Sequence, residues 1–293
     1  MNVLSTIVVA TDFSARANRA VKRAARLAHE HEAALHLLFV LERQPLEDLR
    51  YLIALGSGDT EDMLLASVKS RMRELAELLH SHYSVPVQSR VAVGTSYAEI
   101  VAEVANEGAD LLVIGAHGEH YLHDMLFGTT ASKVIRTVTA PVLIVRNEEI
   151  DPYANVLVAV DFSFRSSRTM RLARELAPET TICALHAVEV PFEARLRAAG
   201  LSDDVIQKYR SQVLIEGRER MDEFLARLAE LRAVHPMVEY GHAPVVMAEQ
   251  RQRFYPDLVV VGRRGEAAEV DVLLGSVTKH IVYEAGCDVL VVP

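Results

Sequence analysis

Short apolar runs alternate with longer amphipathic stretches along the whole chain. Residues 3–10 form an apolar, β-branched run that is typical of a buried strand, and from Ser14 onward alanine and leucine recur near the helical spacing. The alternation predicts strands at residues 3–10, 34–40, 86–93, 109–115, 141–145, 155–160, 181–188, 237–241, 258–262 and 289–292. It predicts helices from Ser14 and from Ser163, and at residues 59–82, 96–106, 132–138, 202–229, 244–253 and 277–283, with an irregular stretch at 45–58.

The order of these elements repeats from the first half of the chain to the second. Three glycines of the first half recur at one constant offset in the second, as Gly115, Gly118 and Gly128 and then Gly262, Gly265 and Gly275. Such a repeat marks an internal duplication. Strands separated by helices favour parallel β-α-β crossovers. We therefore predict an α/β chain of two tandem five-stranded parallel open-sheet domains, at residues 1–147 and 154–293, joined by a short polar segment.

A glycine-rich segment follows the fourth predicted strand of each half. The first copy reads Gly115-x-x-Gly118, then nine residues, then Gly128-Thr129-Thr130; the second reads Gly262-x-x-Gly265, then nine residues, then Gly275-Ser276, with Thr278 close behind. Glycines let backbone N–H groups approach an anion, a hydroxyl adds a donor, and a helix N-terminus adds partial positive charge. In open parallel sheets, ligands bind outside the carboxyl ends of the strands. The spacing therefore predicts one phosphate-cradling loop in each half.

The same segments resemble the universal stress protein family. In the first half the resemblance rests on residues 9–14 (VATDFS), the glycine segment and residues 140–145 (APVLIV); in the second it rests on residues 160–163 (VDFS), the glycine segment and residues 289–292 (VLVV). The chain is similar to a tandem member of the UspA-like group, whose members bind ATP. The resemblance implies a Rossmann-like fold of the adenine nucleotide α-hydrolase type.

The resemblance also implies roles for individual residues. It assigns the glycine loops and their hydroxyl residues to the triphosphate and ribose of ATP, with Mg²⁺ as a companion ion: Gly115, Gly118, Gly128, Thr129, Thr130, Gly262, Gly265, Gly275, Ser276 and Thr278. It places Asp12 and Asp161 near the adenine and ribose, and backbone groups of Val40 and Val188 at the base edge. The alternative for both aspartates is a role as turn or N-cap residues before a helix. Either loop could also be a structural turn without a ligand.

The two loops differ in charge. The first offers His117, whereas the second offers Arg263 and Arg264, which either contact phosphate or lie in solvent. If they contact phosphate, the second loop holds a triphosphate more tightly. Neither loop ends in the Gly-Lys-Ser/Thr of a P-loop, so no lysine is placed to reach the β and γ phosphates. The sequence contains no familiar catalytic motif, and slow ATP hydrolysis is the most that we expect.

Two further polar groups invite a functional interpretation. The densest histidine group lies inside the first loop, and we interpret it as lining the anion site and not as a metal site: His117, His120 and His123, followed by Asp124. An acidic group near the fourth strand is interpreted as a solvated helix surface and strand entry: Glu103, Glu107 and Asp110. No metal site is predicted.

Composition restricts the partners and the location. The 293 residues carry a formal charge of −9, and without a basic stripe we expect neither nucleic-acid nor membrane binding. No apolar run approaches the roughly 18 residues of a membrane span. Two cysteines, Cys183 and Cys287, form no disulfide framework. We expect a cytoplasmic location.

The leading hypothesis is a cytoplasmic stress-response protein that binds ATP and uses it to regulate conformation or the choice of protein partner. One alternative is an ATP hydrolase or nucleotidyl-group enzyme, and another is an adaptor with empty nucleotide sites. The apolar fifth strands would otherwise be exposed edges. Because family members pair through this strand, we expect an intrachain pseudo-dimer, and a homodimer as a further assembly.

Overall fold

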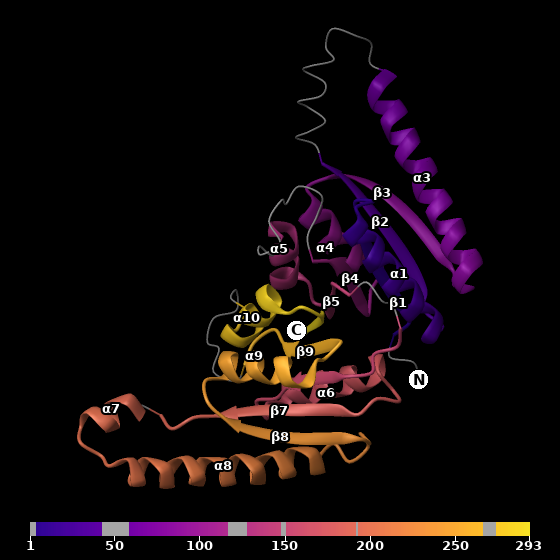
Figure 1. The fold of residues 1–293 in the computed structure, drawn as a ribbon. Coiled ribbons are helices and arrows are strands. Elements are labelled where there is room, and N and C mark those ends of the chain that lie inside the picture. The colour runs from indigo at the N-terminus through magenta and orange to yellow at the C-terminus, as the bar shows by residue number, and fades with distance from the viewer. Residues whose placement is uncertain (1–3, 43–58, 117–127, 148–150, 192, 266–273) are drawn as a thin grey trace. The chain divides into compact units, whose positions relative to one another are not determined.

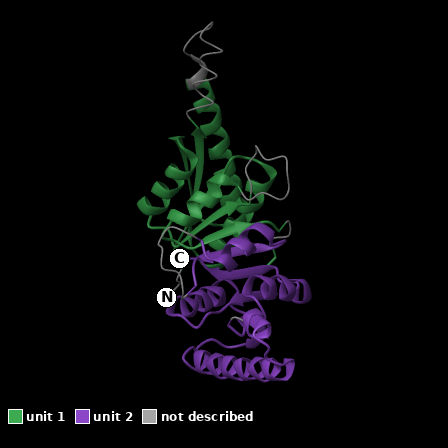
Figure 2. Ribbon diagram, turned by 90° about the vertical axis from the view of Figure 1, so that its left-hand side faces the viewer, with its two compact units in different colours: residues 1–151, 293 green, residues 152–292 purple. Residues whose placement is uncertain are grey.

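A computed structural model describes residues 4–42, 59–116, 128–147, 151–191, 193–265 and 274–293. The chain divides into two compact units, residues 1–151 and residues 152–292 (Figure 2). Several residues singled out in the sequence lie outside the described part: the irregular stretch 45–58, His117, Gly118, His120, His123 and Asp124. Among the described residues, no helix is long and apolar enough to cross a membrane.

Unit 1 is a parallel sheet with helices between its strands (Figure 1). Its strands are β1 (Thr6–Thr11), β2 (Ala34–Glu42), β3 (Val87–Gly94), β4 (Leu111–Gly115) and β5 (Val142–Val145). Its helices are α1 (Ala15–Glu30), α3 (Asp59–Tyr83), α4 (Ser96–Asn106) and α5 (Thr129–Thr137). The strands pair in parallel in the order β3-β2-β1-β4-β5.

Unit 2 repeats this plan. Its strands are β6 (Val156–Ala159), β7 (Ile182–Val188), β8 (Val234–Tyr240), β9 (Leu258–Gly262) and β10 (Asp288–Val292). Its helices are α6 (Phe164–Leu176), α7 (Glu193–Ala198), α8 (Asp203–Ala226), α9 (Ala243–Phe254) and α10 (Ser276–Glu284). The parallel order β8-β7-β6-β9-β10 is the order of unit 1. The predicted fold class, a tandem α/β chain with open parallel sheets, is confirmed.

Helices cover both faces of the sheet in unit 1. His36 of β2 lies 3.3 Å from the carboxylate of Glu107, just after α4. Phe39 of the same strand stacks on Phe13, whose ring is covered by Arg71 of α3. Because residues of odd and even number on a strand point to opposite faces, α3 and α4 lie on opposite sides of β2. The sheet between them is the apolar core, with Leu35, Leu37 and Leu38 fully buried.

The structure corrects several boundaries and one element. β2 extends two residues beyond the predicted end, to Glu42, and α5 begins at Thr129, at the last glycine of the motif, and not at residue 132. The short helix α7 was not predicted, because its six residues bury no side chain and carry no apolar periodicity. The predicted pairing of the two halves through their fifth strands stays a prediction.

The interpretation of the acidic group as solvated is wrong for Glu103. Only 2% of Glu103 is exposed, and its carboxylate accepts a hydrogen bond from Arg90 of β3. Asp110 is half-buried, and its Oδ2 accepts hydrogen bonds from the backbone N–H groups of Ser5 (2.8 Å) and Thr6 (3.0 Å) at the start of β1. Glu107 is exposed, as expected.

Serine residues begin the first helix of each unit, as the sequence predicts. The Oγ of Ser14 accepts from the N–H of Ala17 at 3.2 Å, and the Oγ of Ser163 accepts from Ser166 in the same way. Each bond satisfies one of the backbone donors that a helix leaves open at its start. Ser202, the N-cap of α8, makes no such side-chain bond.

This difference can be measured. Ser14→Ala should lower the free energy of unfolding by about 1 kcal/mol, because it removes an N-cap acceptor, whereas Ser202→Ala should have a clearly smaller effect. Urea unfolding of both variants and of the wild type, followed by circular dichroism, tests this. Equal losses in the two variants would contradict the capping role of Ser14.

Candidate functional site

In each unit, the candidate residues lie where the strand order changes direction. From β1 the chain builds outward through β2 and β3 and then returns to place β4 on the other side of β1; unit 2 does the same around β6 and β9. Val9 pairs with Val113, and Val158 pairs with Val260. The residues that follow these paired strands therefore emerge side by side at the carboxyl edge, the usual place for a ligand in an open parallel sheet.

The two aspartates after β1 and β6 organise the turns into the first helices. Asp12 Oδ1 accepts from the N–H of Ser14 at 2.9 Å, and Asp161 Oδ1 accepts from the N–H of Ser163 at 3.0 Å. The hydroxyls of Ser163 and Ser166 also donate to Asp161 Oδ1. Each aspartate thus holds an Asx-turn. The N-cap is the following serine, so the turn alternative applies to the aspartates and the N-cap alternative does not.

The residue inside each turn has an unusual backbone. Phe13 and Phe162 have φ angles of 62° and 66°, in the left-handed region that bulky residues rarely adopt. Their rings are held by neighbours: Phe13 stacks on Phe39 with 5.0 Å between centroids, and Phe162 lies 4.1 Å from the ring of His186. Left-handed bulky residues persist only where their surroundings fix them, and such residues cluster at functional sites.

Strand register corrects one correspondence between the units. Ala10 pairs with Leu38, and Ala159, its counterpart, pairs with Leu185. Leu38 and Leu185 are therefore equivalent positions of β2 and β7. Two residues further along each strand, Val40 is equivalent to Ala187 and not to Val188. The carbonyl of Val188 accepts from the N–H of Gly241 at 2.8 Å. Val40 itself lies two residues before the end of β2.

The described ends of the second glycine loop close on each other beside Asp161. A Cβ placed on Gly265 would lie 3.4 Å from Asp161 Oδ2. A Cβ on Gly275 would lie 3.4 Å from the Cα of Arg264, and the N–H of Gly275 donates to the carbonyl of Arg263 at 3.0 Å. Strand end, loop end and aspartate, far apart in sequence, therefore meet at one place in unit 2.

A helix N-terminus opens at this place in each unit. Gly275 is the N-cap of α10 and Gly128 is the N-cap of α5, and neither cap has a side-chain hydrogen bond. Ser276 and Thr129 are the first helical residues. A helix start without a side-chain cap presents backbone N–H groups and partial positive charge to an anion.

Three of the predicted site residues have structural roles. Thr278 is buried, and its hydroxyl donates to the carbonyl of Gly262 at 2.6 Å. The hydroxyl proton is therefore used within the protein and is not directed at a phosphate. A Cβ on Gly115 would lie 3.3 Å from the backbone of Arg16 and Ala17 at the start of α1. A Cβ on Gly262 would lie 3.2 Å from the carbonyl of Arg264. These two glycines permit close packing at the strand end.

The remaining predicted residues divide by unit. In unit 2, Arg263 and Arg264 are half-buried in the closed loop, and the N–H of Arg263 donates to the carbonyl of Val292 at the end of β10. In unit 1, Gly128 is buried, Thr129 is exposed and Thr130 is half-buried at the start of α5. His117 and Gly118 lie outside the described residues.

Comparison with known proteins agrees with this architecture. A model of the universal stress protein family matches residues 4–146 and again residues 152–293. The chain belongs to the universal stress protein family. A universal stress protein of Mycolicibacterium smegmatis is 25% identical in an alignment of 293 positions that covers 98% of this chain and 96% of the relative.

Another relative matches about half of the chain in sequence, and a solved structure matches the fold of the whole chain. Universal stress protein A homolog 2 of Coxiella burnetii is 33% identical over 126 residues, which cover 43% of this chain and 83% of the relative. The crystal structure of a universal stress protein from Archaeoglobus fulgidus, 18% identical, has a TM-score of 0.67 and covers 98% of this chain and 97% of its own. Its likeness supports the fold of a tandem member.

A polar cluster that the sequence did not reveal fixes the segment after β7 in this universal stress protein. Glu193 of α7 accepts from Arg210 of α8 at Oε1 (2.6 Å) and Oε2 (3.0 Å), and from the hydroxyl of Tyr240 at the end of β8. Arg210 also lies over the Tyr240 ring, 4.6 Å from its centroid. Only the spacing of Glu193 to Arg197, which also pair, was visible in the sequence; the partners on α8 and β8 are not local.

The cluster predicts a specific acid sensitivity. The hydrogen bond from Arg210, and after it that from Tyr240, lower the pKa of Glu193 from 4.5 to about 2. Because the pKa of Glu193 is lower in the folded protein than in the unfolded chain, its ionised form stabilises the fold at every pH above the pKa of the unfolded chain. This stabilisation is lost as the pH falls from about 4.5 through 2. Glu193→Gln should therefore melt at a lower temperature than the wild type at pH 7, and the difference should shrink below pH 4.5.

Melting temperatures of wild type, Glu193→Gln and the control Glu189→Gln, measured from pH 7 downward, test this prediction. Glu189 is exposed in the same segment, so its variant should follow the wild type. A Glu193→Gln deficit that stays constant with pH would contradict the charged role of Glu193.

Proposed function

We propose that this universal stress protein binds an adenine nucleotide, ATP with Mg²⁺, at the carboxyl edge of each sheet, and that the nucleotide regulates conformation or partner choice in a cytoplasmic stress response. The observation that carries the proposal is the closed second loop. Gly265 and Gly275 bring the two ends of the loop to Asp161 and to the uncapped start of α10. Glycine at position 275 lets the two ends of the loop pack backbone against backbone, and glycine at position 265 keeps a side chain out of the space beside Asp161.

The chemistry of this edge suits a nucleotide phosphate. Ser276 and Thr129 are the first residues of helices that have no side-chain cap, so their backbone N–H groups are presented at the helix start. A helix start attracts phosphate. Asp161 Oδ1 accepts the hydrogen bonds of its turn, and Oδ2 lies on the side of Gly265. A carboxylate oxygen in this position can accept a hydrogen bond from a ribose hydroxyl. We assign the base edge to backbone groups near the end of β2 at Val40 and of β7 at Ala187 and Val188.

The two sites are proposed to differ in affinity. The second loop carries Arg263 and Arg264, and the first carries His117. Guanidinium groups keep their charge at neutral pH and bind phosphate strongly. We therefore expect unit 2 to hold the triphosphate more tightly, and a chain that retains a single nucleotide to retain it there.

Binding stoichiometry tests the site assignment. Isothermal titration of the full chain with ATP and Mg²⁺ should give two nucleotides per chain. Gly265→Val should remove the tighter site, because its Cβ would lie 3.4 Å from Asp161 Oδ2 and its γ-methyl groups would fill the space that we assign to the nucleotide. Gly118→Val should remove the weaker one. The control is Gly286→Val at the amino edge before β10, where a Cβ meets the Nη1 of Arg251 at 3.5 Å.

The outcomes separate the proposal from its alternatives. Unchanged stoichiometry in both loop variants would overturn the assignment. A wild-type chain that binds neither ATP, ADP, AMP nor cAMP, and gains no stability at saturating nucleotide, would favour an adaptor; binding at 100 times the Kd should add about 2.7 kcal/mol. Sustained multiple turnover of ATP would favour a hydrolase.

A further inference from the structure

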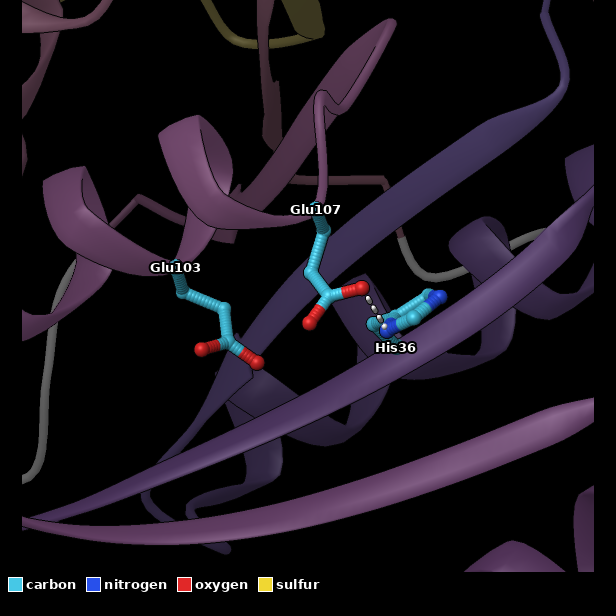
Figure 3. Close-up of side chains that lie close together, drawn as sticks. All are labelled: His36, Glu103 and Glu107. Atoms are coloured by element: carbon cyan, nitrogen blue, oxygen red, sulfur yellow. Dashed lines mark ion pairs between the residues drawn. The ribbon is translucent and has the colours of Figure 1, made fainter.

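A histidine and two glutamates come together on the α4 face of unit 1, within the described part of the chain. Figure 3 shows His36 on β2 next to the carboxylate of Glu107, with Glu103 to the left; the two glutamates lie one helical turn apart at the end of α4. His36 Nδ1 is 3.3 Å from a carboxylate oxygen of Glu107. One ligand atom from each of the three side chains lies within 4.8 Å of the others.

Two of the three side chains are buried. Glu103 is 2% exposed and His36 is 7% exposed, whereas Glu107 reaches solvent. A buried carboxylate without compensation is costly, and the fold compensates Glu103 with Arg90 of β3. Glu107 is a second negative charge at the i,i+4 spacing, which is repulsive on a helix. The cluster therefore brings two carboxylates and one imidazole together, and the guanidinium of Arg90 contacts only Glu103 among them.

The sibling unit shows that the fold does not require these charges. His36 pairs with Val8, and the register-equivalent residue in unit 2 is Cys183, which pairs with Leu157. Glu103 and Gln250 are each the eighth residue of their helices, α4 and α9, and both are buried.

Arg90 and Glu107 also have uncharged counterparts in unit 2. Arg90 pairs with Leu38, and its equivalent Met237 pairs with Leu185; Phe254 stands where Glu107 stands. Burial raises the pKa of the Cys183 thiol to about 11, so this position offers no thiolate in unit 2. The same architecture is thus built with an uncharged set of residues in unit 2 and, in unit 1, with a histidine, two glutamates and an arginine.

We propose that His36, Glu103 and Glu107 form a site for a divalent transition metal, with Zn²⁺ as the best fit. One imidazole nitrogen and two carboxylates suit Zn²⁺ and its neighbours, whereas Mg²⁺ and Ca²⁺ prefer oxygen ligands alone. Three protein ligands leave the fourth position of a tetrahedral ion for water.

Arg90 competes with the metal for Glu103. Zn²⁺ binds its ligands at about 2.0–2.2 Å, so the carboxylates must turn toward His36, and Arg90, which holds one oxygen of Glu103, pulls that carboxylate away from the ion. The Arg90 side chain is 46% exposed, so its guanidinium can turn into water when the ion enters. Loss of Arg90 should therefore tighten metal binding, while loss of any of the three ligands weakens it.

The experiment measures Zn²⁺ bound to the full chain by equilibrium dialysis against zinc chloride. Glu103→Gln copies the residue that unit 2 carries at this buried position, so the variant is expected to fold. It should lose one Zn²⁺ per chain or bind it at least 10-fold more weakly, since loss of even an outer-shell partner costs about 10- to 100-fold. Arg90→Met, also copied from unit 2, should bind Zn²⁺ more tightly than the wild type.

Glu249→Gln, an exposed glutamate on α9, is the matched control and should bind like the wild type. Zinc held elsewhere, for example by His117, His120 and His123, adds the same amount in every variant and cancels. Equal Zn²⁺ binding by Glu103→Gln and Glu249→Gln overturns the site. Weaker binding by Arg90→Met overturns the competition with Arg90.

Discussion

Parallel strand pairing is the constraint on which both candidate loops depend. Because every strand within a unit runs in the same direction, the segments after β1 and β4, or after β6 and β9, emerge at one edge. The helices between the strands bury both faces of the sheet and fix its register. The closeness of Gly265 to Asp161 therefore results from the strand order and not from any local preference of the loop.

A single side chain connects this constraint to the proposed chemistry. Asp161 uses Oδ1 to hold the turn that starts α6, and three groups on Ser163 and Ser166 donate to that oxygen. The turn places Phe162 in the left-handed region and leaves Oδ2 facing the glycine loop. Structural and binding roles of an aspartate are often treated as alternatives, but its two oxygens allow both at once.

The sequence predicted the features that depend on local periodicity and spacing. Strands, helices, the duplication and the serine caps follow from residues close in the chain, and so does the position of each glycine loop after its strand. Features set by non-local contacts were missed. Glu103 looks like a solvated helix residue until Arg90 of β3 is placed beside it, and Thr278 looks like a phosphate ligand until its hydroxyl meets the carbonyl of Gly262. No spacing rule contains such pairs, because strand register decides them.

The duplication supplies a comparison that a single domain cannot. The two units share one strand order and one helix order, so equivalent positions pack in equivalent places. If a position is charged in one unit and uncharged in the other, the fold does not require the charge. By this reasoning the serine caps and the aspartate turns, present in both units, serve the common architecture. Within the part of the chain that the structure describes, the cluster of His36, Glu103 and Glu107 has no counterpart in unit 2, and the sequence of unit 1 has no arginine pair in place of Arg263 and Arg264. Where the siblings diverge in charge, the packing that they share does not account for the difference.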